Sequence, residues 1–272
     1  MRALLCTLFA SIASLAFAEI KLEPVGYEID GTRHQGYIAY NDGAVGKPPG
    51  VLVFPEWWGA NEYAQSRARM LAELGYVAMV ADMYGEGKTT SDRAEAQKLA
   101  SSVYSNPETL KKRAEAALAA LQQSGRGDPS RIAAIGYCMG GTVALNLARA
   151  GADLKAVVGF HCGLANVVGE TGKIKAKVLI CNGADDKMIS DEEEQAFEQE
   201  MRDGGVDWLY VSFGGALHSF TNPEADKHRD MGSVGYNRNA DHRSWRMMRM
   251  FLDEALDHRP AGPAERGIGS PR

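Results

Sequence analysis

The sequence has no concentrated positive charge. Its 30 lysines and arginines are outnumbered by 35 aspartates and glutamates, which gives a net charge of −5, and no basic run is interleaved with aromatic residues. Nucleic acids and anionic membranes attract proteins through clustered positive charge. We therefore expect neither a nucleic acid nor, for the mature protein, a membrane as a partner.

Long hydrophobic runs are also missing, except at the N-terminus. There Arg2 supplies a positive charge, residues 3–15 are apolar, and Ala16-Phe17-Ala18 has the small-x-small pattern of a cleavage site. The apolar run is shorter than the ~20 residues that a membrane-spanning helix needs. We expect a signal peptide over residues 1–18, cleaved before Glu19, and a periplasmic or secreted mature protein.

Cysteine is scarce, with four residues in the chain, and removal of the signal peptide would leave Cys138, Cys162 and Cys181. None of these cysteines has the spacing of a zinc site or of a Cys-x-x-Cys redox pair, so we expect no metal and no cofactor. An odd number of thiols in an oxidising compartment leaves at least one unpaired or paired with another chain. The count is typical of a protein that keeps one thiol free.

The rest of the chain alternates apolar runs with helix-like segments. Strands buried on both faces of a parallel sheet are expected at 51–54, 77–80, 132–135, 156–159 and 178–181. A hairpin at 27–30 and 35–40 precedes them, and a last strand at 207–213 follows. Helices are expected at about 61–75, 91–105, 107–123, 140–150, 191–204 and 240–257.

This alternation predicts one α/β domain over residues 19–258. Its sheet would be doubly wound and mostly parallel, with about eight strands and helices on both faces. The segment 259–272 is rich in proline, glycine and charge, and we expect it to be disordered.

Reactive side chains follow three of the predicted strands, and parallel strands end at one edge of the sheet. Cys138 stands in Gly136-Tyr137-Cys138-Met139-Gly140, which is the nucleophile-elbow pattern with cysteine in place of serine. A helix N-terminus behind the thiol favours the thiolate, and the Met139 N–H can face a developing oxyanion. The turn alone is equally compatible with a buried structural cysteine.

A candidate base and a candidate acid at neighbouring strand ends favour the interpretation of Cys138 as a nucleophile. His218 lies on a glycine-rich loop after the last strand, where an elbow nucleophile needs its base. Asp185 and Asp186 are adjacent after the seventh strand; the Gly-x-x-Asp spacing from Gly183 selects Asp186, and Asp185 remains the alternative. Glu56 follows the third strand beside two tryptophans, where partial desolvation would make it reluctant to ionise.

Five motifs resemble the dienelactone hydrolase family of α/β-hydrolases over residues 20–257. They are Pro-Glu-Trp-Trp-Gly, Asp-Met-Tyr-Gly, Gly-Tyr-Cys-Met-Gly-Gly, Gly-Ala-Asp-Asp and Gly-Gly-Ala-Leu-His-Ser-Phe. The resemblance implies that Cys138 is the nucleophile, His218 the base and Asp186 its orienting acid. It also implies that Glu56 contacts the thiol and that the N–H groups of Trp57 and Met139 form the oxyanion hole.

One position departs from the family pattern. Members that act on dienelactone carry an arginine four residues after the histidine, and Asn222 stands there in this chain. A neutral amide does not grip a carboxylate as a guanidinium does. With Trp57, Trp58 and Tyr84 nearby in the motifs, we expect an apolar pocket and a small-molecule ester or lactone as substrate.

The resulting hypothesis is an exported hydrolase that forms an acyl-thioester on Cys138. Three alternatives remain: a thioesterase or acyltransferase at the same elbow, a non-catalytic binding protein on a hydrolase scaffold, and a redox protein in which Cys162 resolves Cys138. Cys181 lies within a predicted strand and is expected in the core. The sequence leaves the oligomeric state and the natural substrate open.

Overall fold

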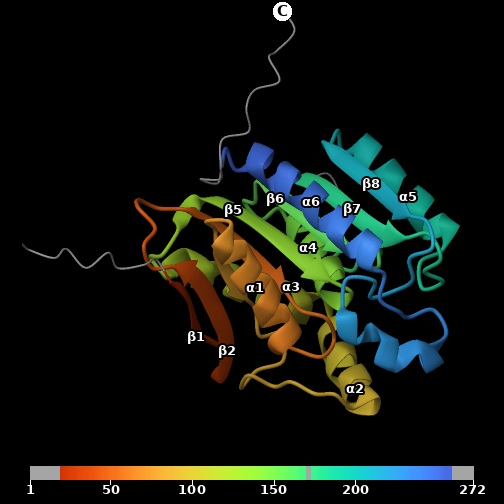
Figure 1. Ribbon diagram of the computed structural model, residues 1–272, viewed down its shortest axis with the longest axis horizontal. Coiled ribbons are helices and arrows are strands. Elements are labelled where there is room, and N and C mark those ends of the chain that lie inside the picture. The colour runs from red at the N-terminus through yellow and green to blue at the C-terminus, as the bar shows by residue number, and fades with distance from the viewer. Residues whose placement is uncertain (1–18, 170–172, 259–272) are drawn as a thin grey trace, which may run out of the picture.

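An eight-stranded sheet runs through the computed structural model, which describes residues 19–169 and 173–258 (Figure 1). The spatial order of the strands is β1-β2-β4-β3-β5-β6-β7-β8. Strand β2 pairs antiparallel with β1 and β4, whereas the remaining pairs are parallel. The strands are β1 (Ile20–Ile29), β2 (Thr32–Asn41), β3 (Pro49–Phe54), β4 (Val77–Val80), β5 (Asp128–Tyr137), β6 (Ala156–Phe160), β7 (Lys177–Gly183) and β8 (Trp208–Phe213).

The expected α/β fold with a mostly parallel sheet and an opening hairpin is thus confirmed. The hairpin is longer than expected, because pairing begins at Ile20 opposite Asn41. The expected signal peptide at 1–18 and the expected disordered tail at 259–272 lie outside the described residues.

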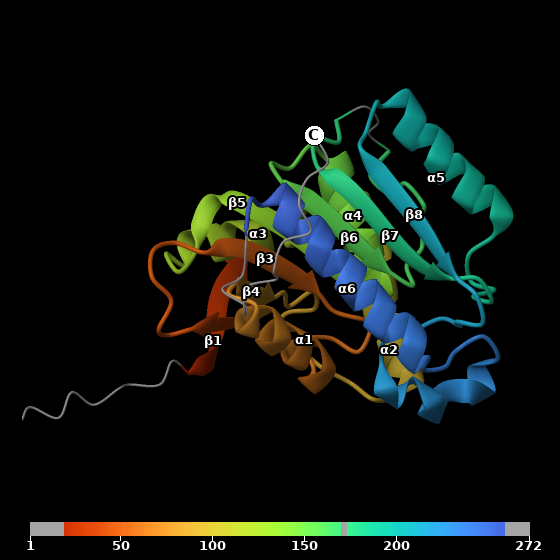
Figure 2. The same cartoon turned by 45° about the horizontal axis from the view of Figure 1, so that its top comes forward.

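Helices cover both faces of the sheet. The α-helices are α1 (Glu62–Glu73), α2 (Arg93–Tyr104), α3 (Pro107–Gln123), α4 (Met139–Arg149), α5 (Asp191–Asp203) and α6 (Arg238–Ala255). Figures 1 and 2 show α1 and α6 in front of the sheet, with α4 behind it. The chain also forms a 3-10 segment, η1 (Pro223–Met231), which the sequence pattern did not indicate.

The apolar runs are explained by burial on two faces. In β3, Val51 and Val53 belong to the core shared with α1 and α6, whereas Leu52 and Phe54 belong to the core shared with α3 and α4. Alternate side chains of a strand point to opposite faces, so a strand inside two layers needs apolar residues at every position. Six consecutive residues of β3 are buried.

Polar residues at helix starts act as caps. The Asn106 side chain accepts hydrogen bonds from the backbone N–H groups of Glu108 and Thr109, directly before Pro107 at the start of α3. Ser190 accepts from the N–H of Glu193 at the start of α5. Each cap satisfies backbone donors that have no partner in the first helical turn, so these helices begin where the sequence predicted.

Candidate active site

The sharp turn between β5 and α4 presents Cys138. Its φ angle is 53°, a left-handed conformation that is strained for a residue with a side chain. Glycines permit the tight approach: a Cβ on Gly136 would lie 2.1 Å from the carbonyl carbon of Gly140, and one on Gly140 would lie 2.2 Å from the Phe54 carbonyl oxygen. The small neighbours expected from the elbow pattern are therefore required by close backbone contacts.

The structure brings Cys138, His218 and Asp186 together. The Nε2 atom of His218 lies 3.0 Å from the Cys138 sulfur, and its Nδ1 atom lies 2.7 Å from Oδ2 of Asp186. The other oxygen of Asp186 accepts a hydrogen bond from the Met188 N–H. Asp185 is exposed, and its backbone carbonyl accepts a hydrogen bond from the Ser233 hydroxyl. The geometry therefore selects Asp186 of the two adjacent aspartates.

Opposing effects act on the pKa of His218. Burial by itself would lower the pKa of His218, but the facing Cys138 sulfur and the Asp186 carboxylate together raise it well above its ordinary value of 6.5. His218 therefore holds its proton more firmly than a free imidazole, 3.0 Å from the Cys138 sulfur.

Glu56 does not contact the thiol, contrary to what the resemblance implied. Its Oε1 atom accepts a hydrogen bond of 2.9 Å from the Ser219 hydroxyl, and its Oε2 atom accepts one of 2.6 Å from the Asn222 amide. Burial raises the pKa of Glu56, while Asn222, Ser219 and then His218 oppose that rise. Both oxygens are engaged by the loop after His218, so the carboxylate is directed at that loop instead of at the sulfur.

Asn222 is itself fully engaged. Its Nδ2 donates to Glu56, and its Oδ1 accepts from the Glu224 N–H as the cap of η1. It lines the cavity, as expected, but its polar atoms are bound to the protein. Asn222 therefore binds Glu56 on one side and the start of η1 on the other.

A large cavity opens above Cys138. Its volume is about 1170 Å³, and Trp57, Trp58, Tyr104, Met188 and Met231 supply much of its apolar wall. Among the described residues that line it no arginine occurs, and Lys227 pairs with Glu224. The cavity is thus apolar with little free positive charge.

Tyr84 does not line this cavity, which corrects its expected place in the substrate pocket. It is buried, and its hydroxyl donates a hydrogen bond of 2.8 Å to the Trp57 carbonyl. Tyr104, which sequence reasoning missed, donates one of 2.9 Å to the Met139 carbonyl. Each residue expected to supply an oxyanion N–H therefore has its own backbone carbonyl held by a tyrosine hydroxyl.

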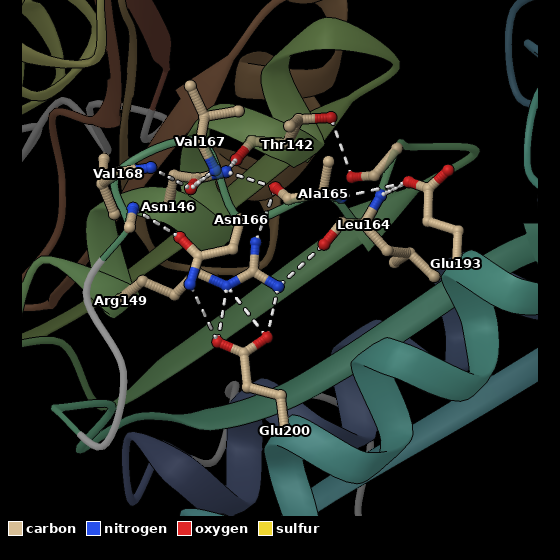
Figure 3. A network of polar contacts seen from close by, with 12 residues as sticks. Thr142, Asn146, Arg149, Leu164, Ala165, Asn166, Val167, Val168, Glu193 and Glu200 are labelled. Carbon is tan, nitrogen blue, oxygen red and sulfur yellow. Dashed lines mark hydrogen bonds and ion pairs between the residues drawn. The ribbon is translucent and has the colours of Figure 1, made fainter.

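A network of polar contacts fixes the loop after β6, which forms one cavity wall through Gly163, Ala165 and Val167. Figure 3 shows the guanidinium of Arg149 between this loop and Glu200. Arg149 is 1% exposed and donates to the carbonyls of Leu164 and Ala165 and to the Glu200 carboxylate. Because the buried guanidinium is hydrogen-bonded to all three residues, it holds this wall of the cavity in place.

The roof of the cavity joins η1 to α2 and to the loop after β3. The ring of Trp58 stacks on that of His228, with ring centroids 4.9 Å apart. Arg93 forms an ion pair with Asp230 and approaches Nδ1 of His228 at 3.3 Å. These contacts of Trp58 and Arg93 with η1 could not be predicted from the sequence, because the residues lie far apart in the chain.

His161 is buried directly beside Cys138. Its Nδ1 atom faces the backbone N–H of Cys138 at 3.2 Å, and its Nε2 atom lies 2.6 Å from the Thr221 hydroxyl oxygen. Burial, and then the nearby His218, lower the pKa of His161 well below 6.5. No sequence motif marks this residue, which stands simply at the end of β6.

All three cysteines of the described chain are free thiols. Cys162 is buried against glycines: a Cβ on Gly141 would lie 2.5 Å from the Cys162 Cβ, and one on Gly159 would lie 2.5 Å from its sulfur. Burial raises the pKa of Cys162 and of Cys181 above the ordinary value. Both therefore act as small core residues, and Cys138 faces a histidine instead of a resolving thiol.

The described residues contain neither a candidate metal site nor a membrane-spanning helix. No group of three or more histidine, cysteine, aspartate or glutamate side chains there is arranged to hold a metal ion. None of the helices in residues 19–169 and 173–258 is long and apolar enough to cross a membrane.

The fold and the elbow geometry define an α/β-hydrolase. Residues 34–256 match the family model for the dienelactone hydrolase family. The chain belongs to this family and is a hydrolase of the type that cleaves esters and lactones.

Three relatives place the chain more closely. It is 40% identical to the crystal structure of a dienelactone hydrolase-like promiscuous phosphotriesterase from metagenomic libraries, with a TM-score of 0.84 over 87% of this chain and 99% of that one. It is 38% identical to an uncharacterized protein of Caenorhabditis elegans over 54% of this chain and 94% of the relative. It is 28% identical to the "Probable 2-oxo-3-(5-oxofuran-2-ylidene)propanoate lactonase" of a Bradyrhizobium species, over 75% of this chain and 86% of the relative.

The buried neutral His161 predicts a specific dependence of stability on pH. Its pKa is lowered in the folded state, so the unfolded chain takes up a proton at this residue as the pH falls through 6.5. This residue should therefore reduce the free energy of unfolding by about 1.4 kcal/mol between pH 7.5 and pH 5.5. His161→Gln should lack this contribution, whatever its stability at neutral pH.

Urea denaturation of the wild type and of His161→Gln at both pH values measures the difference. The other titrating groups are common to the two proteins, so the comparison isolates residue 161. Equal losses of stability on acidification would show that His161 is protonated in the folded protein.

Proposed function

We propose that the protein hydrolyses neutral carboxylic esters or lactones through an acyl-thioester on Cys138. The observation that carries the proposal is the alignment of sulfur, imidazole and carboxylate, with 3.0 Å between Cys138 and His218 and 2.7 Å between His218 and Asp186. Both Cys138 and His218 line the large cavity, so a bound substrate could reach them.

In the proposed acylation, the Cys138 thiolate attacks the substrate carbonyl carbon. A carbon–sulfur bond forms, and the carbonyl electron pair moves to the oxygen, which the N–H groups of Trp57 and Met139 stabilise. Each such donor contributes about 2.7–4 kcal/mol in the transition state. The electron pair then returns, the bond to the alcohol oxygen breaks, and the His218 imidazolium gives that oxygen its proton.

In the proposed deacylation, His218 removes a proton from water as the water oxygen attacks the thioester carbon. The carbon–sulfur bond breaks, the carboxylic acid leaves, and Cys138 returns to a thiolate beside the imidazolium. Asp186 keeps the imidazole oriented through both steps. The buried Glu56 holds the loop after His218 through its hydrogen bonds to Ser219 and Asn222, without touching the substrate.

The charge of the cavity supports a neutral substrate. The amide of Asn222 is engaged by Glu56, and Lys227 at the wall pairs with Glu224. Glu62 and Glu224 also line the cavity, but they pair with Arg69 and Lys227, so the described lining offers a substrate carboxylate no unpaired lysine or arginine. Apolar contact with the tryptophans and methionines is left as the main source of binding energy.

A second candidate substrate class is the neutral phosphotriester, favoured by the 40% identity to a promiscuous phosphotriesterase. The thiolate would form a sulfur–phosphorus bond and expel an aryloxide, and water would then release the phosphodiester. Such a substrate is uncharged, as the cavity requires.

Replacement of the nucleophile tests the covalent mechanism. Cys138→Ala should lower kcat/KM for p-nitrophenyl acetate by about 10³-fold or more, because the thiolate is removed. Cys138→Ser should also be strongly impaired, since a serine hydroxyl is far harder to ionise beside the same imidazole. Brief incubation of the wild type with substrate should add one acetyl group to Cys138, seen by mass spectrometry.

Iodoacetamide should abolish the wild-type activity, and the matched variant Cys181→Ala should remain both active and sensitive. Full activity of Cys138→Ala would contradict the cysteine mechanism. Complete inactivity of the wild type on short esters and lactones would instead support a non-catalytic binding protein.

Matched substrates test the charge preference. We expect kcat/KM to be roughly tenfold lower for p-nitrophenyl hemisuccinate than for p-nitrophenyl butyrate, because the carboxylate of the former loses its hydration in a cavity whose described lining includes no arginine. The same panel should include a five-membered lactone and p-nitrophenyl diethyl phosphate. Faster cleavage of the hemisuccinate would contradict the proposal for neutral substrates.

We also propose that the protein is exported, on the strength of the positive charge, apolar run and small-x-small site in residues 1–18. Expression of the full chain in a bacterial host should yield a periplasmic or secreted protein whose N-terminal residue is Glu19. Deletion of residues 2–18 is the control and should leave the protein in the cytoplasm. An uncleaved full-length chain in the cytoplasmic fraction would refute export.

A further inference from the structure

The backbone amide of the nucleophile is held by the end of β6. The Cys138 N–H donates to the Phe160 carbonyl at 3.0 Å and also points at Nδ1 of His161 at 3.2 Å. His161 has a φ of 39°, so the backbone turns sharply there. This turn directs the imidazole back toward the elbow instead of along the sheet.

The far side of the same ring contacts the loop that carries the base. Nε2 of His161 lies 2.6 Å from Oγ1 of Thr221, which stands three positions after His218 in the chain. The Thr221 carbonyl accepts a hydrogen bond of 2.5 Å from Arg67, and its hydroxyl lies 2.6 Å from that of Tyr63. Thr221 is therefore anchored to α1 on one side and bound to His161 on the other.

The neighbours of His161 determine where its single proton lies. An imidazole that is neutral carries one N–H, and Nδ1 faces the N–H donor of Cys138, so Nδ1 is assigned as the acceptor. The proton is then on Nε2 and is donated to the Thr221 hydroxyl. A neutral ring also avoids repulsion with the His218 imidazolium, whose ring centroid is 5.5 Å away.

We propose that His161 is a positioning residue for the reaction, resting on the proposed cysteine mechanism. Its neutral imidazole links the nucleophile to the base loop through two hydrogen bonds, Cys138 N–H to Nδ1 and Nε2–H to Thr221. This relay holds the sulfur and the His218 ring in their contact at 3.0 Å. Because reaction rates fall steeply with misplacement of reacting groups, losing the relay lowers turnover more than substrate binding.

Removal of the Thr221 hydroxyl tests the relay without altering the triad or His161. Thr221→Val should lower kcat on p-nitrophenyl butyrate by about 10- to 100-fold, with KM changed by no more than about twofold. Thr221→Ser restores the hydroxyl and should recover most of kcat. Thr221→Ala removes the hydroxyl with a smaller side chain and should behave like Thr221→Val.

Tyr76→Phe is the matched control, since it also deletes a buried hydroxyl, one bonded to Asp253 away from the cavity. It should keep the wild-type kcat. Circular dichroism at the assay temperature checks that each variant is folded. Equal kcat values for Thr221→Val, Thr221→Ala and the wild type would overturn the relay, as would failure of Thr221→Ser to restore a lost kcat.

The rate of Cys138 alkylation by iodoacetamide separates this inference from the proposed function. The reagent reads the thiolate directly, without any ester being cleaved. Alkylation should slow by about tenfold in Thr221→Val, because the thiolate loses its alignment with the imidazolium. A wild type that cleaves no ester would refute the proposed function, whereas slower alkylation in the variant would still support the relay and an unchanged rate would overturn it.

Discussion

The tight passage of the chain from β5 into α4 is the constraint on which the site depends. Gly136 and Gly140 pack so closely against neighbouring backbone atoms that neither position has room for a side chain. Cys138 lies between them with a φ of 53°. The surrounding sheet must stabilise this strain. It does so through the buried strands on either side, β3 and β6, whose register with β5 sets the position of the sulfur. The most strained residue of the turn is thereby also the one presented to the cavity.

The buried polar groups Glu56 and Arg67, close to the elbow, are hydrogen-bonded to other residues of the protein. Glu56 is held by Ser219 and Asn222, while Arg67 reaches Thr221 and Asp241. Burying such groups is costly unless each one is hydrogen-bonded. Because the partners come from the loops after β3 and β8 and from α1 and α6, the network also fixes the loop that carries His218. The same contacts thus stabilise the fold and hold the loop of His218 in place.

Asn222 affects the site in two ways. It places no positive charge at the cavity wall, and its amide binds one oxygen of Glu56. Both features fit the proposed hydrolysis of neutral substrates, which would be recognised by apolar contact and shape. A phosphotriester and a neutral ester share those requirements, which is consistent with the relative that cleaves phosphotriesters.

The sequence alone determined the order of elements, the parallel sheet, and the positions of Cys138, Asp186 and His218 at its carboxyl edge, because apolar periodicity and turn glycines are local signals. It misplaced Tyr84 and the partner of Glu56, and it did not indicate η1 or the contacts of His161. Those features depend on side chains from distant segments meeting in space, such as His161 with Thr221 and Tyr84 with the Trp57 carbonyl. Hydrogen bonds of that kind have no sequence period, so only the tertiary structure decided them.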